Sequence, residues 1–106
     1  MRIKSELVWG DSIRDRGKLY DLLLSGKLPH GYYLLLCTAE RKLEFIPAKM
    51  QSNRYFISRD CTVFGIAHGK KEACEMICHI MEQIYVEHTY ASVSDFAGEV
   101  LGEPVC

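Results

Sequence analysis

The segment from Lys70 to Glu87 constrains the fold of this chain more than any other, because it carries a clear helical pattern of apolar side chains. At 100° per residue these side chains form one continuous arc, while acids, amides and His79 fill most of the opposite side, which only Val86 interrupts. An arc this wide needs a sheet to cover it, so we expect a long amphipathic helix packed on a sheet. In angular order, the arc consists of Met76, Ile80, Ala73, Ile84, Ile77, Met81, Cys74, Tyr85 and Cys78.

The segments before this helix supply the strands of the expected sheet. Residues 2–8 alternate loosely between polar and apolar side chains, which is typical of a short strand. Four further segments are rich in residues that favour strands and are separated by turn residues. These segments are Gly31–Cys37, Lys42–Ala48, Arg54–Ser58 and Cys61–Ala67. The first is almost continuously apolar, which favours a central strand that is covered on both faces.

Two shorter helices complete the predicted elements. One is capped by Asp11 or Asp15, runs to about Ser25 and ends at Gly26, a residue type that suits the left-handed position after a helix. The other is expected from about Ser94 to Leu101, where serines precede the first turn and apolar side chains share one side.

The resulting order, β-α-β-β-β-β-α-α, predicts an α+β fold in a single domain over residues 1–106, with residues 103–106 as a loose tail. We expect a mostly antiparallel sheet of four to five strands, one N-terminal helix, one long amphipathic helix and a short C-terminal helix. If the C-terminal helices cover one face of the sheet, the other face needs the first helix or a second copy of the chain. A homodimer is therefore one of the expectations.

The cysteines and the charge indicate the compartment and the class of partner. The chain has five cysteines and no Cys-x-x-Cys pair, and its first residues contain no apolar leader segment. We therefore expect reduced thiols in a small cytoplasmic, bacterial protein. The longest apolar run, residues 32–37, is far shorter than the roughly 20 residues that a membrane helix needs. The formal net charge of −1 argues against nucleic acid bound through a general basic field.

The most site-like feature is His68-Gly69-Lys70-Lys71, which passes from a strand through a glycine into the start of a helix. The free N–H groups of a helix start attract anions, Gly69 lets the backbone approach a ligand, and the lysines add positive charge. His68 has the chemistry of an acid or base near neutral pH. No glycine-rich phosphate-loop motif is present. The plainer interpretation, a glycine turn followed by two surface lysines, stays open.

Two sets of side chains on the long helix have spacings that metal ligands also use. Cys74 and Cys78 lie four residues apart, but free cysteines behave as small apolar side chains and favour burial. Glu75, His79 and Glu82 share the solvent side, where ordinary surface pairing explains them more simply. We therefore predict no metal and no cofactor.

Aromatic side chains on the expected strands raise one more alternative. Sheets that bind RNA stack bases on such rings and surround them with basic residues, but the Gly/Phe signature of those sheets is missing here. Tyrosine and arginine are also enriched at protein interfaces. The residues concerned are Tyr32, Tyr33, Tyr55 and Phe56, with Arg41, Lys42 and Arg54 near them.

No catalytic set emerges from the sequence. Cys61 and His68 lie at opposite ends of one expected strand, about 23 Å apart at 3.3 Å per residue. The first functional hypothesis is therefore a non-catalytic binding or protein-interaction module that self-associates. The alternative is a small-molecule anion- or phosphate-binding protein, or an enzyme, with its site at His68, Gly69, Lys70 and Lys71.

Overall fold

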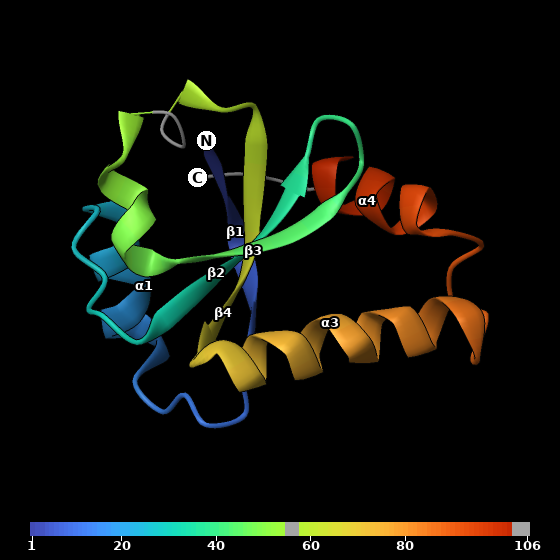
Figure 1. Cartoon of the computed structure of the whole chain (residues 1–106), viewed down its shortest axis with the longest axis horizontal. Helices are drawn as coiled ribbons and strands as arrows, with labels where there is room; N and C mark the ends of the chain where they lie inside the picture. Colours follow the sequence, from blue (N-terminus) through green and yellow to red (C-terminus); the bar gives the residue numbers. More distant parts are fainter. Residues whose placement is uncertain (55–57, 103–106) are drawn as a thin grey trace.

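The computed structural model describes residues 1–54 and 58–102 and shows an α+β domain built on a four-stranded sheet (Figure 1). The predicted fold class is confirmed. In chain order the elements are β1 (Arg2–Trp9), α1 (Arg16–Leu24), β2 (Tyr32–Thr38), β3 (Leu43–Pro47), the 3-10 helix η1 (Ala48–Ser52), β4 (Cys61–His68), α3 (Lys70–Tyr85) and α4 (Val93–Gly102). Within the described residues, no helix is long and apolar enough to cross a membrane.

The sheet is mixed, with the strand order β1-β4-β2-β3. The central strand β2 is antiparallel to both β3 and β4, whereas β1 runs parallel to β4. Two of the three pairings are therefore antiparallel, as expected. The parallel pairing is irregular, because Ile3 pairs with Val63 but Val8 pairs with Gly65, so the middle of β1 bulges from the register.

Arg54–Ser58, which we expected to be a strand, differs from that prediction at both of its ends. Arg54 and Ser58 have helical backbone, and the Ser58 hydroxyl donates a 2.9 Å hydrogen bond to the Arg54 carbonyl four residues earlier. Residues 55–57 lie outside the described residues, and so do Tyr55 and Phe56 of the aromatic set. The side chains of this segment favour strands, but this preference is weak and tertiary context overrides it.

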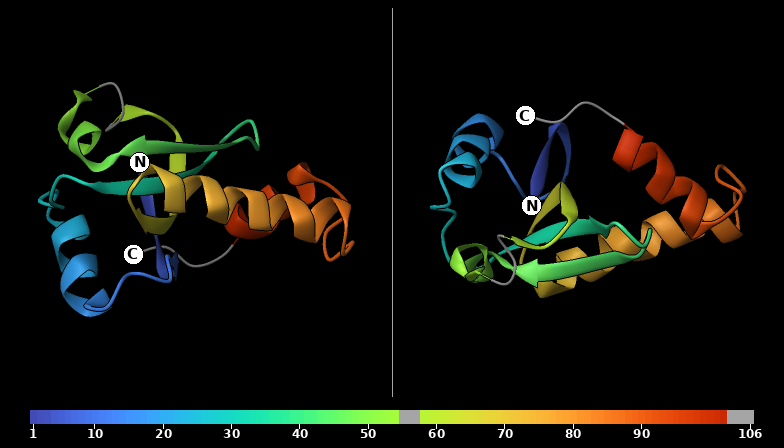
Figure 2. Two further views of the ribbon diagram at one scale, coloured as in Figure 1. Left: turned by 60° about the horizontal axis from the view of Figure 1, so that its bottom comes forward. Right: turned by 90° about the horizontal axis from the view of Figure 1, so that it is seen from above.

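The central strand β2 is covered on both faces within one chain. Side chains alternate along β2, so Leu34 and Leu36 join a core with α1 and η1, while Leu35 and Cys37 join a second core with α3 and α4. Figures 1 and 2 show α1 on one side of the sheet and α3 with α4 on the other. Of the two expected covers for the second face, the first helix is the one observed. A second copy of the chain is not needed to bury β2.

The long helix α3 agrees with its prediction except at its end. Its buried line consists of Ala73, Ile80 and Ile84, which belong to the predicted apolar arc. The helix ends at Tyr85 instead of Glu87, because the N–H groups of residues 86 and 87 both donate to the carbonyl of Glu82. This shared acceptor breaks the regular pattern in which each carbonyl serves one N–H group four residues later.

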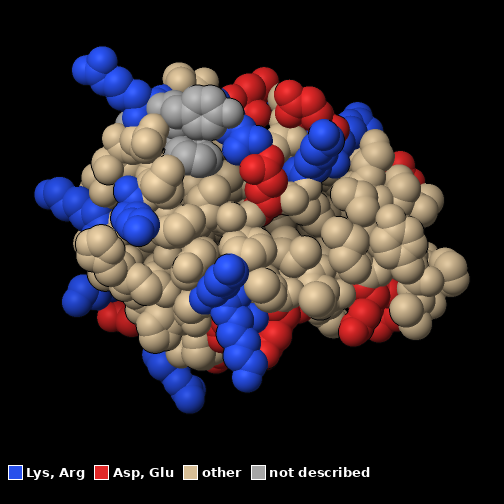
Figure 3. Space-filling view, viewed as in Figure 1, with Lys and Arg blue, Asp and Glu red and all other residues tan. Residues whose placement is uncertain are grey.

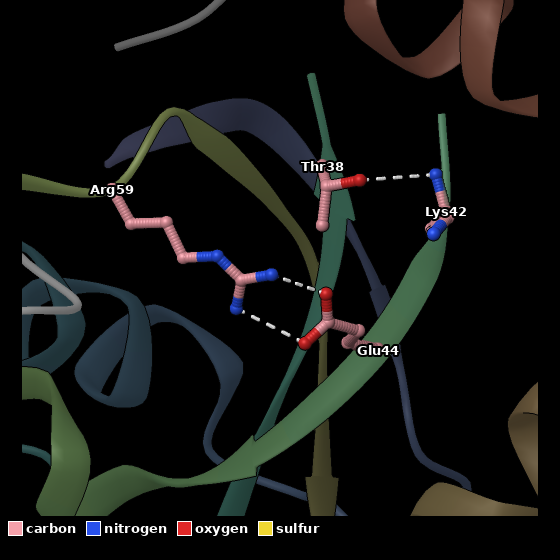
Figure 4. Close-up of polar contacts among 4 residues, drawn as sticks. All are labelled: Thr38, Lys42, Glu44 and Arg59. Carbon is pink, nitrogen blue, oxygen red and sulfur yellow. Dashed lines mark hydrogen bonds and ion pairs between the residues drawn. The ribbon is translucent and has the colours of Figure 1, made fainter. Parts of the chain in front are cut away.

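Polar contacts fix the outer strand β3 at the other end of the sheet (Figure 4). The guanidinium of Arg59, just before β4, binds the carboxylate of Glu44 on β3 through two nitrogens, one of them 3.0 Å from Oε1. The backbone N–H of Lys42 donates to the Thr38 hydroxyl at 3.1 Å, which closes the turn between β2 and β3. These contacts hold the edge strand in one position, and its apolar side chains with it.

Candidate functional site

The turn between β4 and α3 has the form that the sequence predicts. Strand β4 ends at His68, Gly69 has a φ of 92°, and α3 begins at Lys70. Residues that carry a side chain rarely adopt a φ in this range, so the position requires glycine. The Gly69 N–H donates to the carbonyl of Gly31 at 2.7 Å, which ties the turn to the start of β2.

A carboxylate already occupies part of this turn. The Glu72 side chain accepts hydrogen bonds from the backbone N–H of His68, at 2.8 Å, and from that of Ser12, at 3.2 Å. Burial acts to raise the pKa of this carboxyl, but the hydrogen bonds from His68 and Ser12 outweigh it and the pKa of Glu72 is lowered. Sequence reasoning missed this role, although a glutamate three positions after a helix-capping residue is a known capping signal.

The predicted site residues do not all meet. His68 stacks on Tyr32, with ring centroids 4.8 Å apart, and lines a hollow of about 390 Å³ between the sheet and α1. Two cations from a distant part of the sequence, Arg14 and Lys18, line the same hollow, together with the carboxylate of Asp15. Lys70 and Lys71 are exposed and lie outside the residues that line it. The structure thus places His68 beside Arg14 and Lys18 instead of Lys70 and Lys71, the two lysines that the sequence suggested.

The most distinctive surface lies along α3. Cys74, Cys78, Met81 and Tyr85 follow one another at intervals of four, three and four residues, and we call these four residues the outer stripe. Both cysteines are exposed, and 64% of Tyr85 is exposed. The expected burial of Cys74 and Cys78 is therefore wrong. The apolar arc of α3 is wider than the part of the sheet that the helix contacts, so the end of the arc that holds the cysteines turns into solvent.

The apolar surface continues from the outer stripe onto the edge of the sheet. Tyr33, Leu43 and Phe45, on β2 and β3, are half-buried and pack against the same core as Met81. The rings of Tyr33 and Phe45 meet edge to face, with centroids 6.0 Å apart. Figure 3 shows this side of the molecule, where uncharged surface extends along the middle and far end of α3, between charged side chains over the upper part of β3 and others at the start of the helix.

The opposite flank of α3 borders a groove of about 660 Å³ that separates the helix from β1. Apolar side chains of β1, α3 and the start of α4 form much of its wall, and acidic side chains stand among them. The residues that line the groove are Val8, Trp9, Asp11, Glu72, Glu75, Met76, His79, Ile80, Gln83, Tyr90 and Phe96.

Metal and thiol chemistry find little support in the geometry. Within residues 1–54 and 58–102, no group of three His, Cys, Asp or Glu side chains is placed to hold a metal ion. Cys37 is fully buried, its Sγ lies 3.9 Å from the carbonyl oxygen of Ala97, and burial raises the pKa of its thiol to about 11. Burial also raises the pKa of Cys61. Neither thiol is therefore an activated nucleophile, since nucleophilic cysteines need an accessible thiolate.

Comparison of the chain with protein-family models, with curated proteins and with solved structures finds no match. The functional argument therefore rests on the surfaces and contacts described above.

Proposed function

We propose that this chain is a non-catalytic protein-interaction module that self-associates, and that two copies meet through the outer stripe and the adjoining edge of the sheet. The observation that carries the proposal is the exposed line of apolar side chains on α3. Exposed apolar side chains are normal when single, whereas a continuous patch of them marks a contact surface.

The spacing of the outer stripe suits a second helix. Intervals of four, three and four residues match the alternating positions that form the seam between two packed helices. In an antiparallel pair centred between Cys78 and Met81, Cys78 of one copy faces Met81 of the other. Tyr85 then faces Cys74, so a small side chain meets a large one at each step. A second copy of α3 therefore fits the stripe in shape as well as in polarity.

The charges on α3 favour the antiparallel arrangement. Lys70 and Lys71 lie in the first turn with Glu72, while Glu87 lies just beyond the other end of α3. An antiparallel two-fold pair places the lysines of each copy near Glu87 of its partner and opposes the two helix dipoles. A parallel pair would instead bring like charges together.

The extent of the patch also supports a dimer. A stable interface removes roughly 800 Å² of each partner from water, which is more than one helix of this length offers. Tyr33, Leu43 and Phe45 continue the apolar surface beyond α3. The free, exposed thiols of Cys74 and Cys78 fit the expected setting in a reducing, bacterial cytoplasm, where they stay unoxidised.

Sedimentation equilibrium tests the proposal, with two matched variants. Tyr85→Glu places a carboxylate in the contact, and we expect the dimer dissociation constant to rise at least about thirtyfold, because a buried aromatic side chain at an interface contributes about 2 kcal/mol or more. Val86→Glu is the control, since 72% of Val86 is exposed and it lies on the polar side of α3. A wild-type chain that stays monomeric, or equal effects of both variants, contradicts the proposal.

The hollow beside His68 favours a second candidate function, the binding of a small anion. Its cations, Arg14 and Lys18, stand beside His68 in place of Lys70 and Lys71, which lie outside the hollow. Thermal denaturation in the presence of inorganic phosphate and of nucleotides tests this candidate. A ligand at a hundredfold excess over its dissociation constant stabilises the fold by about 2.7 kcal/mol, and this gain should vanish in the Lys18→Ala, His68→Ala double variant. No shift with any of these anions removes the candidate.

A further inference from the structure

The groove between β1 and α3 exists because the helical layer on that face of the sheet stops short of the edge strand. Helices α3 and α4 pack chiefly on β2 and β4. On the opposite face, Ile3 and Leu7 of β1 pack against the core that includes α1, and Trp9 contacts that core while also lining the groove. The side chain of Val8 points into the groove instead and is 49% exposed, although it belongs to a paired strand. Among residues 1–54 and 58–102, strand β1 is thus covered on one face only.

The groove has a preferred charge. Asp11, Glu72 and Glu75 line it, and no lysine or arginine of the described part of the chain does. The Glu72 carboxylate is held by the N–H groups of His68 and Ser12, while Asp11 and Glu75 are exposed. The groove is therefore apolar on its floor and negative at its rim, which is complementary to a ligand that is apolar with basic side chains.

The dimensions of the groove match a short helix. The lining residues on α3 run from Glu72 to Gln83, which corresponds to about 16 Å at 1.5 Å per residue, or roughly three turns. A helix of that length placed beside α3 would lie over β1 and complete the helical layer. Its apolar side chains would contact Val8, Met76 and Ile80.

We propose that this groove binds an amphipathic helix from a partner protein, with one apolar face and with lysine or arginine along its flank. The mode is that of an apolar helix face laid into a groove, with charge complementarity at the rim. The proposal does not depend on self-association, because the groove lies on the flank of α3 opposite to the outer stripe.

The single tryptophan of the chain provides the readout, because Trp9 lines the groove. The probe is a synthetic helical peptide of about 14 residues, with Leu and Phe at positions i, i+3, i+4 and i+7 and lysines beside them. A matched peptide carries glutamates in place of the lysines. We expect the lysine peptide to produce a saturable change in Trp9 fluorescence, and the glutamate peptide to produce none.

Variants of the protein then locate the binding. Val8→Glu should abolish binding, and Glu75→Lys should raise the dissociation constant about tenfold or more, because it reverses a rim charge. Glu40→Lys is the control, since it makes the same change at an exposed turn residue remote from the groove and should bind as the wild type does. Circular dichroism establishes that each variant is folded.

Several outcomes overturn the proposal. The first two are the absence of a saturable signal and equal binding of the lysine and glutamate peptides. The third is an equal effect of Glu75→Lys and Glu40→Lys on binding. The fourth is tighter binding of an extended peptide of alternating Val and Lys than of the helical lysine peptide. A Trp9 signal that depends on protein concentration without peptide would assign the groove to a second copy and also overturn it. Tyr85→Glu should bind the lysine peptide as well as the wild type does, so failure of the proposed dimer and failure of the groove are distinguishable.

Discussion

The two flanks of α3 differ in charge although they belong to one helix and border one core. The flank toward β3 carries the outer stripe, where exposed cysteines and Tyr85 adjoin a surface with few charges. The flank toward β1 borders the groove, where Glu75 and Asp11 stand beside apolar side chains. Both flanks exist because the apolar arc of the helix is wider than the sheet surface beneath it. Both flanks expose apolar side chains of α3. The charged side chains around them, which differ between the flanks, therefore determine which partner fits each one.

The largest expected effect comes from a polar substitution among the buried side chains of α3, Ala73, Ile80 and Ile84, which lie between the two flanks. Ile84 is 1% exposed, so Ile84→Asp buries a carboxylate without a partner and should cost more than about 4 kcal/mol, enough to unfold many small domains. Urea denaturation followed by circular dichroism measures this loss. Val86→Asp, at an exposed position on the same helix, should change stability by less than about 0.5 kcal/mol. A folded Ile84→Asp protein of wild-type stability would show that this line does not hold α3 to the sheet.

The second prediction compares the reactivity of the exposed thiols of the outer stripe with that of a buried thiol in the core. Cys74 and Cys78 should react with iodoacetamide at least about a hundredfold faster than Cys37, because the thiolate is the reactive form and burial raises the pKa of Cys37 to about 11. Peptide mapping by mass spectrometry assigns each modified cysteine. Protection of Cys74 and Cys78 at high protein concentration would sharpen the comparison, since these two thiols lie in the proposed dimer contact and the thiol of Cys37 does not. Equal rates at all these cysteines would contradict the arrangement.

The third prediction concerns Glu72, an acid of the groove that also holds the turn. Its lowered pKa means that its stabilising effect is present above the pKa of the unfolded chain, roughly 4.3, and is lost as the pH falls through the lower pKa of the folded state. Glu72→Gln should therefore cost about 1 kcal/mol at pH 7 and less in acid. Urea denaturation at pH 7 and pH 3 measures both values. A loss that is the same at both values would show that the charge of Glu72 is irrelevant.

The smallest expected effect distinguishes the two orientations of the proposed dimer. Lys71→Glu should weaken an antiparallel dimer by about 0.5 kcal/mol at low salt, because it removes an attraction between exposed charges. The double variant with Glu87→Lys should recover that loss, because Glu87 of one copy lies beside Lys71 of the other in this pair. Sedimentation equilibrium at low and high salt measures it, and salt should reduce the difference. In a parallel dimer Lys71→Glu replaces one pair of like charges with another, so an unchanged dissociation constant would favour that orientation.

Sequence patterns predicted the elements that have one strong periodicity. The helix from Lys70 and the central strand from Gly31 carry patterns that local preferences and burial both support, and the structure confirms both. The strand predicted over Arg54–Ser58 had only the local preference, and its described ends are helical. Agreement between local preference and tertiary context is therefore what separated the correct predictions from the wrong one.

The candidate sites were less accessible to sequence reasoning. A helical arc shows which side chains share a side, but the width of the sheet beneath it decides where burial stops, so the exposure of Cys74 and Cys78 was not visible. The hollow joins His68 to Arg14 and Lys18, which lie some fifty residues earlier, and no spacing rule links such distant positions. Glu72 was the exception, since its position after Gly69 carried a usable signal.

The position of β4 has a consequence for the order in which the chain is made. This strand is synthesised last of the four but lies between β1 and β2, so β1 has no neighbouring strand until residues 61–68 have left the ribosome. A nascent chain that stops before Cys61 holds the β2–β3 hairpin and an isolated β1. Cooperative folding must therefore wait for β4, because this strand joins β1 to the β2–β3 hairpin.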